Sequence, residues 1–287
     1  MKKLITLTTL LFLGTSWAQQ SLKVMNWNIF MIPPIVYKSC QCDRAQLIGD
    51  QVADWNPDVI VFNEAFQKKP RKIIWKALKE QYPYASKQTK GGLFKVNSGV
   101  WILSKYEIKK QRNIIFKAKE GSDGMSKKGA VMAELNVNGQ HIQVFGTHVQ
   151  SGGENVAVRE KQFKQMMDEL IKPNYCDTIP QFVSGDLNTN YFKTPDLSAM
   201  LSIFDAETPS FEGEQYSIDG ERNDLNWKFF GSEEQILDYV LVLKNKKHRI
   251  RTGITRILSA VQSRKICKEE FTALSDHNPV MTEIIIE

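Results

Sequence analysis

Short apolar runs that stop at a polar, chemically active residue recur along this sequence. Six segments have this form, and the residues at their ends are Asn28, Glu64, His148, Asp186 with Asn188, Asp238, and Asp276 with His277. A single case indicates little, because Asx-rich turns and satisfied buried histidines are common. Catalytic groups often sit on loops at strand ends, where a rigid sheet holds them. Six cases in one chain therefore favour a sheet-based fold whose strand ends share one polar site.

The residues between these positions predict a mixed fold. Apolar alternation and short buried runs predict strands over residues 22–27, 59–62, 99–103, 130–137, 141–145, 179–183, 236–243 and 280–286. Helical spacing of apolar residues predicts helices over residues 44–55, 71–81 and 156–171. Asn138-Gly139 is a strong hairpin signal between two of these strands. Because a hairpin lies among alternating strands and helices, we expect a layered α+β architecture rather than a purely parallel sheet.

The N-terminus has the form of a secretory signal peptide. Met1-Lys2-Lys3 is basic, an apolar run follows over residues 4–13, and Ser16-Trp17-Ala18 offers small residues for a signal peptidase. The apolar run is too short to span a bilayer, which disfavours a membrane anchor. We expect residues 1–18 to be removed and the protein to be secreted. No linker or repeat interrupts residues 19–287, so they are expected to form a single catalytic domain.

Four cysteines follow the predicted cleavage site: Cys40, Cys42, Cys176 and Cys267. An even number in an exported chain favours disulfides. Cys40 and Cys42 are too close in sequence for an easy mutual bridge, so each is expected to reach a distant partner, and the pairing stays open. A zinc site is disfavoured, because no second close pair of Cys or His accompanies them.

The formal net charge is +6, and two of the lysines that contribute to it lie in the predicted signal peptide. The remaining excess suits an anionic substrate or surface without identifying one. The densest basic run, residues 244–251, is better explained as a solvated loop than as a nucleic-acid patch.

The strand-end residues are chemically complementary. Hard cations such as magnesium prefer oxygen ligands, which Asn28, Glu64 and Asp276 can supply. Imidazole titrates near neutrality, at about 6.5, so His148 and His277 can act as acid and base.

Three further aspartate and asparagine residues complete this set. Asp186 and Asn188 are two apart, so on an extended backbone both side chains point to one face. One suits an attacking water and the other a phosphoryl oxygen. Asp238 could orient an imidazole from behind. A metal, a base and a phosphate-binding amide together predict hydrolysis of a phosphodiester.

The order of these motifs resembles the endonuclease/exonuclease/phosphatase superfamily. The matching segments span nearly the whole exported chain and are Asn28, Asn63-Glu64, Gly146-Thr147-His148, Gly185-Asp186-Leu187-Asn188, Leu237-Asp238-Tyr239 and Ser275-Asp276-His277. Each motif is weak alone, and their order and spacing carry the resemblance. It implies a four-layered α/β/β/α sandwich of the deoxyribonuclease-like type and a divalent-metal phosphoesterase.

Other segments resemble the bacterial secreted neutral sphingomyelinases. They are Ser126-Lys127-Lys128-Gly129, Thr147-His148-Val149-Gln150, Val158-Arg159 with Gln162, and Pro209-Ser210-Phe211-Glu212-Gly213. This resemblance implies hydrolysis of sphingomyelin to ceramide and phosphocholine by a monomer that acts peripherally on a sphingomyelin-containing membrane surface and binds no nucleic acid. The alternative is a secreted magnesium-dependent nuclease on the same fold.

The resemblance also implies roles around a metal. Glu64 would be the principal ligand of Mg²⁺, or of another divalent cation such as Mn²⁺ or Co²⁺, with help from Asn28 and Asp276. His277 would take a proton from the attacking water, with Asp238 behind it.

The remaining roles concern the water and the phosphate. Asp186 would position the attacking water, and Asn188 and His148 would hold the phosphate. His148 is also a candidate to protonate the leaving ceramide oxygen.

The sequence departs from this family in two places. A peripheral metal site of the family is expected to be absent, or replaced by a lysine charge that faces lipid phosphate, since its ligand positions hold Lys68 and Val96-Asn97. Membrane-active members expose an aromatic hairpin before the final Ser-Asp-His, whereas residues 257–267 contain no Trp, Phe or Tyr. Ile257, Leu258 and Ile266 would then either contact the membrane or face the core.

Overall fold

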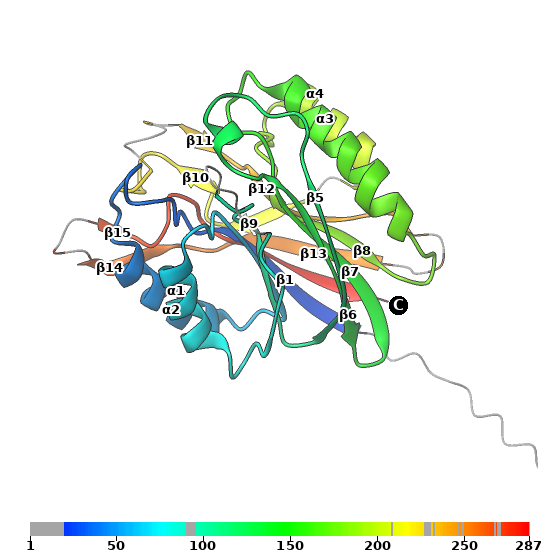
Figure 1. The fold of residues 1–287 in the computed structure, drawn as a ribbon, viewed down its shortest axis with the longest axis horizontal. Coiled ribbons are helices and arrows are strands. Elements are labelled where there is room, and N and C mark those ends of the chain that lie inside the picture. Colours follow the sequence, from blue (N-terminus) through cyan, green and yellow to red (C-terminus); the bar gives the residue numbers. More distant parts are fainter. Residues whose placement is uncertain are drawn as a thin grey trace, which may run out of the picture.

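Two β-sheets pack face to face at the centre of the molecule, and helices cover their outer faces (Figure 1). The computed structural model describes residues 20–89, 96–207, 209–226, 231, 233–245, 247, 250–266, 268 and 271–286. The predicted signal peptide lies outside these residues. Within them, no helix combines the length and the apolar character needed to cross a bilayer.

The first sheet has seven strands in the order β3 (Tyr84–Ala85), β4 (Trp101–Ser104), β2 (Val59–Asn63), β1 (Gln20–Asn28), β16 (Val280–Ile286), β13 (Ile250–Ile257) and β9 (Phe211–Gly213). The second has five in the order β12 (Asp238–Val242), β8 (Gln181–Asp186), β7 (Gln140–His148), β6 (Gly129–Val137) and β5 (Glu107–Ile115). Two small sheets pair β10 (Ile218–Asp219) with β11 (Glu234–Gln235), and β14 (Val261–Ile266) with β15 (Phe271–Ala273).

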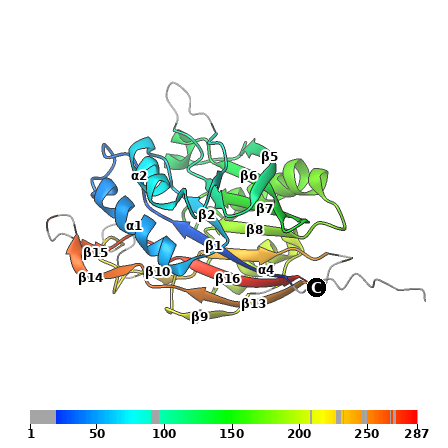
Figure 2. The same ribbon diagram turned by 90° about the horizontal axis from the view of Figure 1, so that it is seen from below.

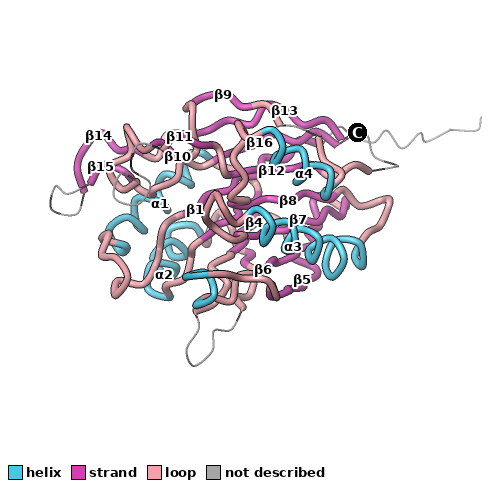
Figure 3. The backbone as a smooth tube through the Cα atoms, turned by 90° about the horizontal axis from the view of Figure 1, so that it is seen from above, coloured by secondary structure: helices cyan, strands magenta, loops and turns pink. Residues whose placement is uncertain are grey.

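Two pairs of helices form the outer layers, as Figures 2 and 3 show. On the seven-stranded sheet lie α1 (Gln41–Trp55) and α2 (Lys68–Leu78). On the five-stranded sheet lie α3 (Val156–Met166) and α4 (Thr194–Phe204). The turns beside them are a 3-10 turn at Gly121–Met125, a π-helical turn at Met167–Ile171 and a 3-10 turn at Lys172–Asn174.

Three apolar layers separate the helices and sheets. Trp27 and Ile74 belong to the layer between the seven-stranded sheet and the helices α1 and α2. Val24 and Phe182 represent the layer between the two sheets. Phe163 belongs to the layer between the five-stranded sheet and α3 and α4. Each such side chain contributes about 1.5–3 kcal/mol when buried. The predicted four-layered α/β/β/α sandwich is therefore confirmed.

The alternation of side chains along each strand positions the polar residues. In β1, Leu22 and Val24 face the second sheet, so Asn26 and Asn28 point the same way. In β8 the same rule places Asp186 on the face of Phe182. Polar groups at strand ends thus continue the apolar layer between the sheets.

Some sequence predictions need correction. Asp238 begins β12, and Asp276 and His277 precede β16, so the expectation that these residues end strands is wrong. Because β12 runs antiparallel to β8, its first residue meets the last residue of β8, and the edge of the sheet is still shared. Ile257 and Ile266 are buried and face the core.

The element boundaries also differ in places. The second helix is Lys68–Leu78 rather than 71–81. The predicted hairpin at Asn138-Gly139 is confirmed, since β6 and β7 pair on either side of it. Neither β5 nor α4 was predicted; every residue of β5 is half-exposed or exposed, so the strand has no buried apolar run.

The cysteines follow the predictions only in part. Cys42 and Cys176 are free thiols, so the expectation of a distant bridge from Cys42 is wrong. Cys40 is disulfide-bonded. Cys267 lies outside the described residues, and the pairing stays a prediction.

Candidate active site

Strand register aligns the polar residues at one edge of the two sheets. In the five-stranded sheet, Asp186 is paired on one side with His148 and on the other with Asp238. In the facing sheet, Asn28 is paired with Asn63. The ends of β7 and β8 and the start of β12 in one sheet, and the ends of β1 and β2 in the other, therefore lie at the same edge.

Asparagine side chains join the two sheets at this edge. The Asn63 Oδ1 accepts a hydrogen bond from the Asp186 amide at 2.8 Å, and its Nδ2 donates to the Thr147 carbonyl at 3.0 Å. The Asn28 Nδ2 donates to Asp186 Oδ2 at 3.1 Å. Two residues before His148, the sheets approach closely at Gly146. A side chain there would place its Cβ only 3.0 Å from both Val61 and Val100, so the close approach requires glycine. Asp186 is thus held from the facing sheet through both its backbone amide and its carboxylate.

His277 and Asp238 form a buried acid–base pair. The His277 Nδ1 lies 2.7 Å from Asp238 Oδ2, and Asn26 Nδ2 donates to the other Asp238 oxygen at 2.8 Å. Because Nδ1 donates to the carboxylate, Nε2 can accept a proton, and it lies 3.7 Å from Asp186 Oδ2. Burial alone would lower the pKa of His277, but the three carboxylates around it raise that pKa to about 10.

Glu64 and Asp276 form the opposite side of the site. Glu64 has a left-handed backbone with φ of 53°, and such strain clusters at functional sites. Its Oε2 atom is buried without a hydrogen-bond partner among the described residues. Burial and the nearby Asp276 raise the pKa of Glu64 to about 8, and burial also raises the pKa of Asp276. His277, Arg44 and Lys128 offset these raised pKa values only in part, so the two adjacent carboxyl groups fit a hard divalent cation.

His148 lies between these two sides. Its Nδ1 is 4.0 Å from Glu64 Oε1, and its Nε2 is 3.4 Å from Asp186 Oδ2. Lys128 Nζ lies 3.1 Å from the same Nε2, and it also pairs with Asp123 at 2.8 Å. Since an ammonium group can only donate, Nε2 accepts and Nδ1 carries the hydrogen. Burial and the Lys128 charge lower the pKa of His148 to about 3.

Asn188 faces an open cavity beside this network. Its amide donates to Asp186 Oδ1 at 3.1 Å, and its Nδ2 lies 3.4 Å from the Val149 carbonyl. The cavity has a volume of about 290 Å³. Its lining residues are Gly152, Gly153, Glu154, Arg159, Asn188, Asn190, Lys193, Asp196, Glu233, Gln235 and Leu237. A substrate group can therefore approach the network from the side of Asn188.

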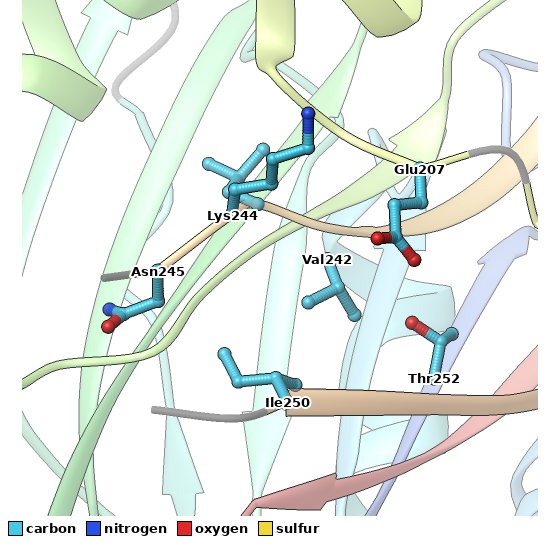
Figure 4. Close-up of a pocket in the computed structure, with 7 residues that line it drawn as sticks. Glu207, Val242, Lys244, Asn245, Ile250 and Thr252 are labelled. Atoms are coloured by element: carbon cyan, nitrogen blue, oxygen red, sulfur yellow. The ribbon is translucent and has the colours of Figure 1, made fainter. Parts of the chain in front are cut away.

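A second cavity, of about 310 Å³, lies at the opposite end of β12 (Figure 4). Val242, Ile250 and Thr252 belong to its lining. It contains none of the predicted site residues, so volume alone does not locate the chemistry.

Comparisons with known proteins agree with this geometry. Residues 31–202 match the Endonuclease/Exonuclease/phosphatase family 2. The chain belongs to this family. A phospholipase C from Staphylococcus aureus is 30% identical over 247 residues, which cover 79% of this chain and 74% of that protein. Sphingomyelinase C 2 from Leptospira interrogans is 31% identical over 247 residues, 78% of this chain and 40% of that protein.

A solved structure from this family superimposes on most of the chain. It is a beta toxin mutant from Staphylococcus aureus with bound magnesium ions. The TM-score is 0.83 and the sequence identity 26%, and the match covers 92% of this chain and 99% of that chain. These relatives place the chain in the bacterial sphingomyelinase branch of the endonuclease/exonuclease/phosphatase family.

All the predicted site residues of this family member lie in one connected network. They are Asn28, Glu64, His148, Asp186, Asn188, Asp238, Asp276 and His277. Asp186, Asp238 and His277 also have ligand atoms within 4.8 Å of one another, a spacing that could hold an ion. We assign the cation to the Glu64 side instead, because Asp238 is already satisfied by His277 and Asn26.

Three residues that support the network carried no predicted role. Asn26 and Lys128 hold Asp238 and His148. Arg44 is completely buried, and its pKa is lowered by burial to about 10. It donates to the carbonyls of Ile29 at 3.0 Å and Leu274 at 2.6 Å, next to the segments of the predicted metal ligands. Arg44 lies four residues before the buried Ile48 and thus on the same face of the helix, and this spacing could have indicated that Arg44 is buried.

Proposed function

We propose that this protein is a magnesium-dependent phosphodiesterase that hydrolyses sphingomyelin to ceramide and phosphocholine. The phosphodiesterase class follows from family membership, and the lipid substrate is inferred from relatives named sphingomyelinase C. Secretion after removal of residues 1–18, a monomeric state and action on membranes remain predictions of the same proposal.

One observation carries this proposal. A hydrogen-bonded pair, His277 with Asp238, and an unpaired carboxylate, Glu64, reach the same space through Asp186 and His148. Each step between neighbours in this chain is 4.0 Å or shorter. A base on one side and a cation-binding carboxylate on the other suit an in-line displacement at phosphorus.

Glu64 and Asp276, with the second lone pair of the Asn28 amide oxygen, would hold the magnesium ion. The first Asn28 lone pair accepts the Phe30 amide at 3.2 Å. When bound, the ion would polarise the phosphoryl group and offset the negative charge that surrounds His277.

His277 takes the proton from the attacking water at Nε2, while Asp238 fixes the ring through Nδ1. Asp186 accepts a hydrogen bond from that water and orients it. The water oxygen bonds to phosphorus as the bond to the ceramide oxygen breaks, and the ceramide oxygen takes up a proton from solvent. Positioning is the main contribution of these residues.

His148 and Asn188 hold the phosphate. Lys128 occupies His148 Nε2, so the free Nδ1–H can donate to a phosphoryl oxygen. This arrangement favours phosphate binding over protonation of the leaving group. Donors aimed at developing charge contribute about 10²–10³-fold to the rate.

The test offers sphingomyelin, phosphatidylcholine and plasmid DNA separately to purified protein, with magnesium or with a chelator. We expect phosphocholine release from sphingomyelin that stops on chelation and in His277→Ala. DNA nicking without phosphocholine release would replace the proposal with a nuclease. Release that persists after chelation would contradict the metal requirement.

A further inference from the structure

An exposed apolar tip projects from the loop between β1 and α1. Ile35 is 95% exposed and Val36 63%, and Ile35 is the most exposed large apolar residue that the structure describes. The tip is a tight turn, because the Val36 and Tyr37 amides donate to the Pro33 carbonyl at 2.8 and 3.2 Å. Single exposed apolar side chains are common, so this tip indicates a contact surface only together with the charges that surround it.

The loop that carries this tip is attached to the active site. The Met31 amide donates to the Glu64 carbonyl at 3.2 Å. Beyond Met31, the Ile32 carbonyl accepts hydrogen bonds from Gln41 at 3.2 Å and from Gln67. Gln67 is the residue before α2, so the tip emerges beside both the proposed metal ligand and the start of that helix.

Lysines lie on the exposed side of α2 at this end. Lys68, Lys69 and Lys72 are exposed, while Pro70 and Ile74 are buried on the other side of the helix. Lys38, two residues after Val36, is also exposed. Among the described ion pairs, none engages any of these four lysines.

This charge pattern opposes the stability of the helix. The first turn of α2 contains no acidic residue. Positive charges near a helix N-terminus are unfavourable, and like charges four residues apart, such as Lys68 and Lys72, repel each other. A pattern that breaks local rules without a compensating contact indicates a function outside the fold.

We propose that these residues form a docking surface for a lipid bilayer that contains anionic lipids. The rim surface consists of Ile35, Val36, Lys38, Lys68, Lys69 and Lys72. Its apolar tip would enter the interface while the lysines contact lipid phosphates. The inference rests on the proposed lipid substrate, and it explains how the site would meet that substrate at a membrane. A solvated basic face or a nucleic-acid surface are the competing explanations.

The test measures binding to phosphatidylcholine vesicles with and without phosphatidylserine, all lacking sphingomyelin. The rim variant, Lys68→Glu with Lys69→Glu, replaces two positive charges of the rim surface by negative charges. Lys76→Glu with Lys79→Glu makes the same charge change about 12–16 Å further along the helix. We expect the rim variant to bind anionic vesicles at least about tenfold more weakly, and the distal variant to stay within about threefold of wild type. Ile35→Ser with Val36→Ser should weaken binding to both kinds of vesicle.

A soluble phosphocholine diester serves as the control for catalysis. Because the rim lies outside the catalytic network, its variants should hydrolyse this substrate at the wild-type rate. Equal losses in the rim and distal variants would overturn the proposal in favour of general electrostatics. Rim-dependent binding to duplex DNA without any vesicle binding would replace the bilayer with nucleic acid. If the wild-type protein binds vesicles and the rim variant does not, but the wild-type protein hydrolyses no sphingomyelin, the docking surface stands and the proposed function is contradicted.

Discussion

The two sides of the active site differ in how completely the protein satisfies them. On one side, every link from Asn26 to Asp238 to His277 is a hydrogen bond of 2.8 Å or less. On the other side, Glu64 keeps a buried oxygen that has no hydrogen-bond partner in the described part of the chain, and Asp276 has a raised pKa. The protein alone satisfies the side of the proposed base, whereas the carboxylate side would be completed by the proposed cation.

The electrostatics follow the same division. The carboxylates around His277 stabilise its charged form, so its pKa rises to about 10 despite burial. Burial and Asp276 destabilise the charged form of Glu64, so its pKa rises to about 8. One ion on the Glu64 side would relieve both conditions. The difference between the sides can therefore be tested by removing one group at a time.

The largest expected effect is that of His277→Ala. Loss of the base should lower kcat on the order of 10³–10⁴-fold, with the metal-free fold retained. Steady-state kinetics with sphingomyelin measures this change. His141→Ala is the matched control, because His141 is half-exposed, lies outside the network and pairs with Glu134. A His277→Ala variant within tenfold of wild type would show that another residue takes the proton.

The next effect is that of Glu64→Gln, which keeps the shape and removes the charge. We expect kcat to fall on the order of 10²–10³-fold and magnesium to bind far more weakly. The metal-free protein should nevertheless melt a few degrees higher near neutral pH, because a carboxyl group whose pKa is raised to about 8 by burial and Asp276 costs stability there, and Gln has no such group. Calorimetry with and without magnesium measures both changes.

Asp238→Asn is the comparison variant for that experiment. It removes a carboxylate that is already paired, so His277 loses its partner and the metal-free protein should melt at a lower temperature. Its gain in melting temperature on adding magnesium should stay close to that of wild type. Opposite signs for the two variants would confirm the division of the site, and equal signs would contradict it.

Much of the site could be predicted from local patterns. Asn28, His148 and Asp186 end strands whose alternation is visible in the sequence, and alternation also decides the face on which they lie. His277 and Asp238 were chosen by residue type, but Asp238 begins a strand and His277 precedes one, since antiparallel pairing brings a strand start to the shared edge. Only the tertiary fold decides that register.

The supporting residues were harder to predict, because their partners are distant in the sequence. Arg44 contacts Leu274 across 230 positions, and Asn26 contacts Asp238 across 212. Local periodicity carries no information about such pairs. Similarly, α4 was missed, although Pro195 stands at the start of the helix, where its missing N–H costs nothing.

Arg44→Lys should have a smaller effect, on the carboxylate side. Arg44 donates to the Ile29 carbonyl, beside Asn28, and to the Leu274 carbonyl, close to Asp276. A lysine cannot reproduce this planar set of donors, so the loops carrying the ligands should loosen and magnesium affinity should fall about 10–100-fold. Magnesium titration followed by calorimetry measures this, with Arg112→Lys on exposed β5 as the control. Unchanged affinity together with a lower melting temperature would limit Arg44 to a role in stability.

Asn26→Ala should have the smallest effect. It tests the hydrogen-bonded side of the site, formed by Asn26, Asp238 and His277. It removes the only side-chain donor described for Asp238 Oδ1, so the carboxylate can rotate away from His277. We expect kcat to fall about tenfold, while KM and magnesium affinity stay unchanged because Glu64 is untouched. Asn113→Ala, a change on exposed β5, is the control for the substitution itself. A loss as large as that of His277→Ala would mean that Asn26 holds the whole pair in place, and a loss of magnesium affinity would mean that the two sides are not independent.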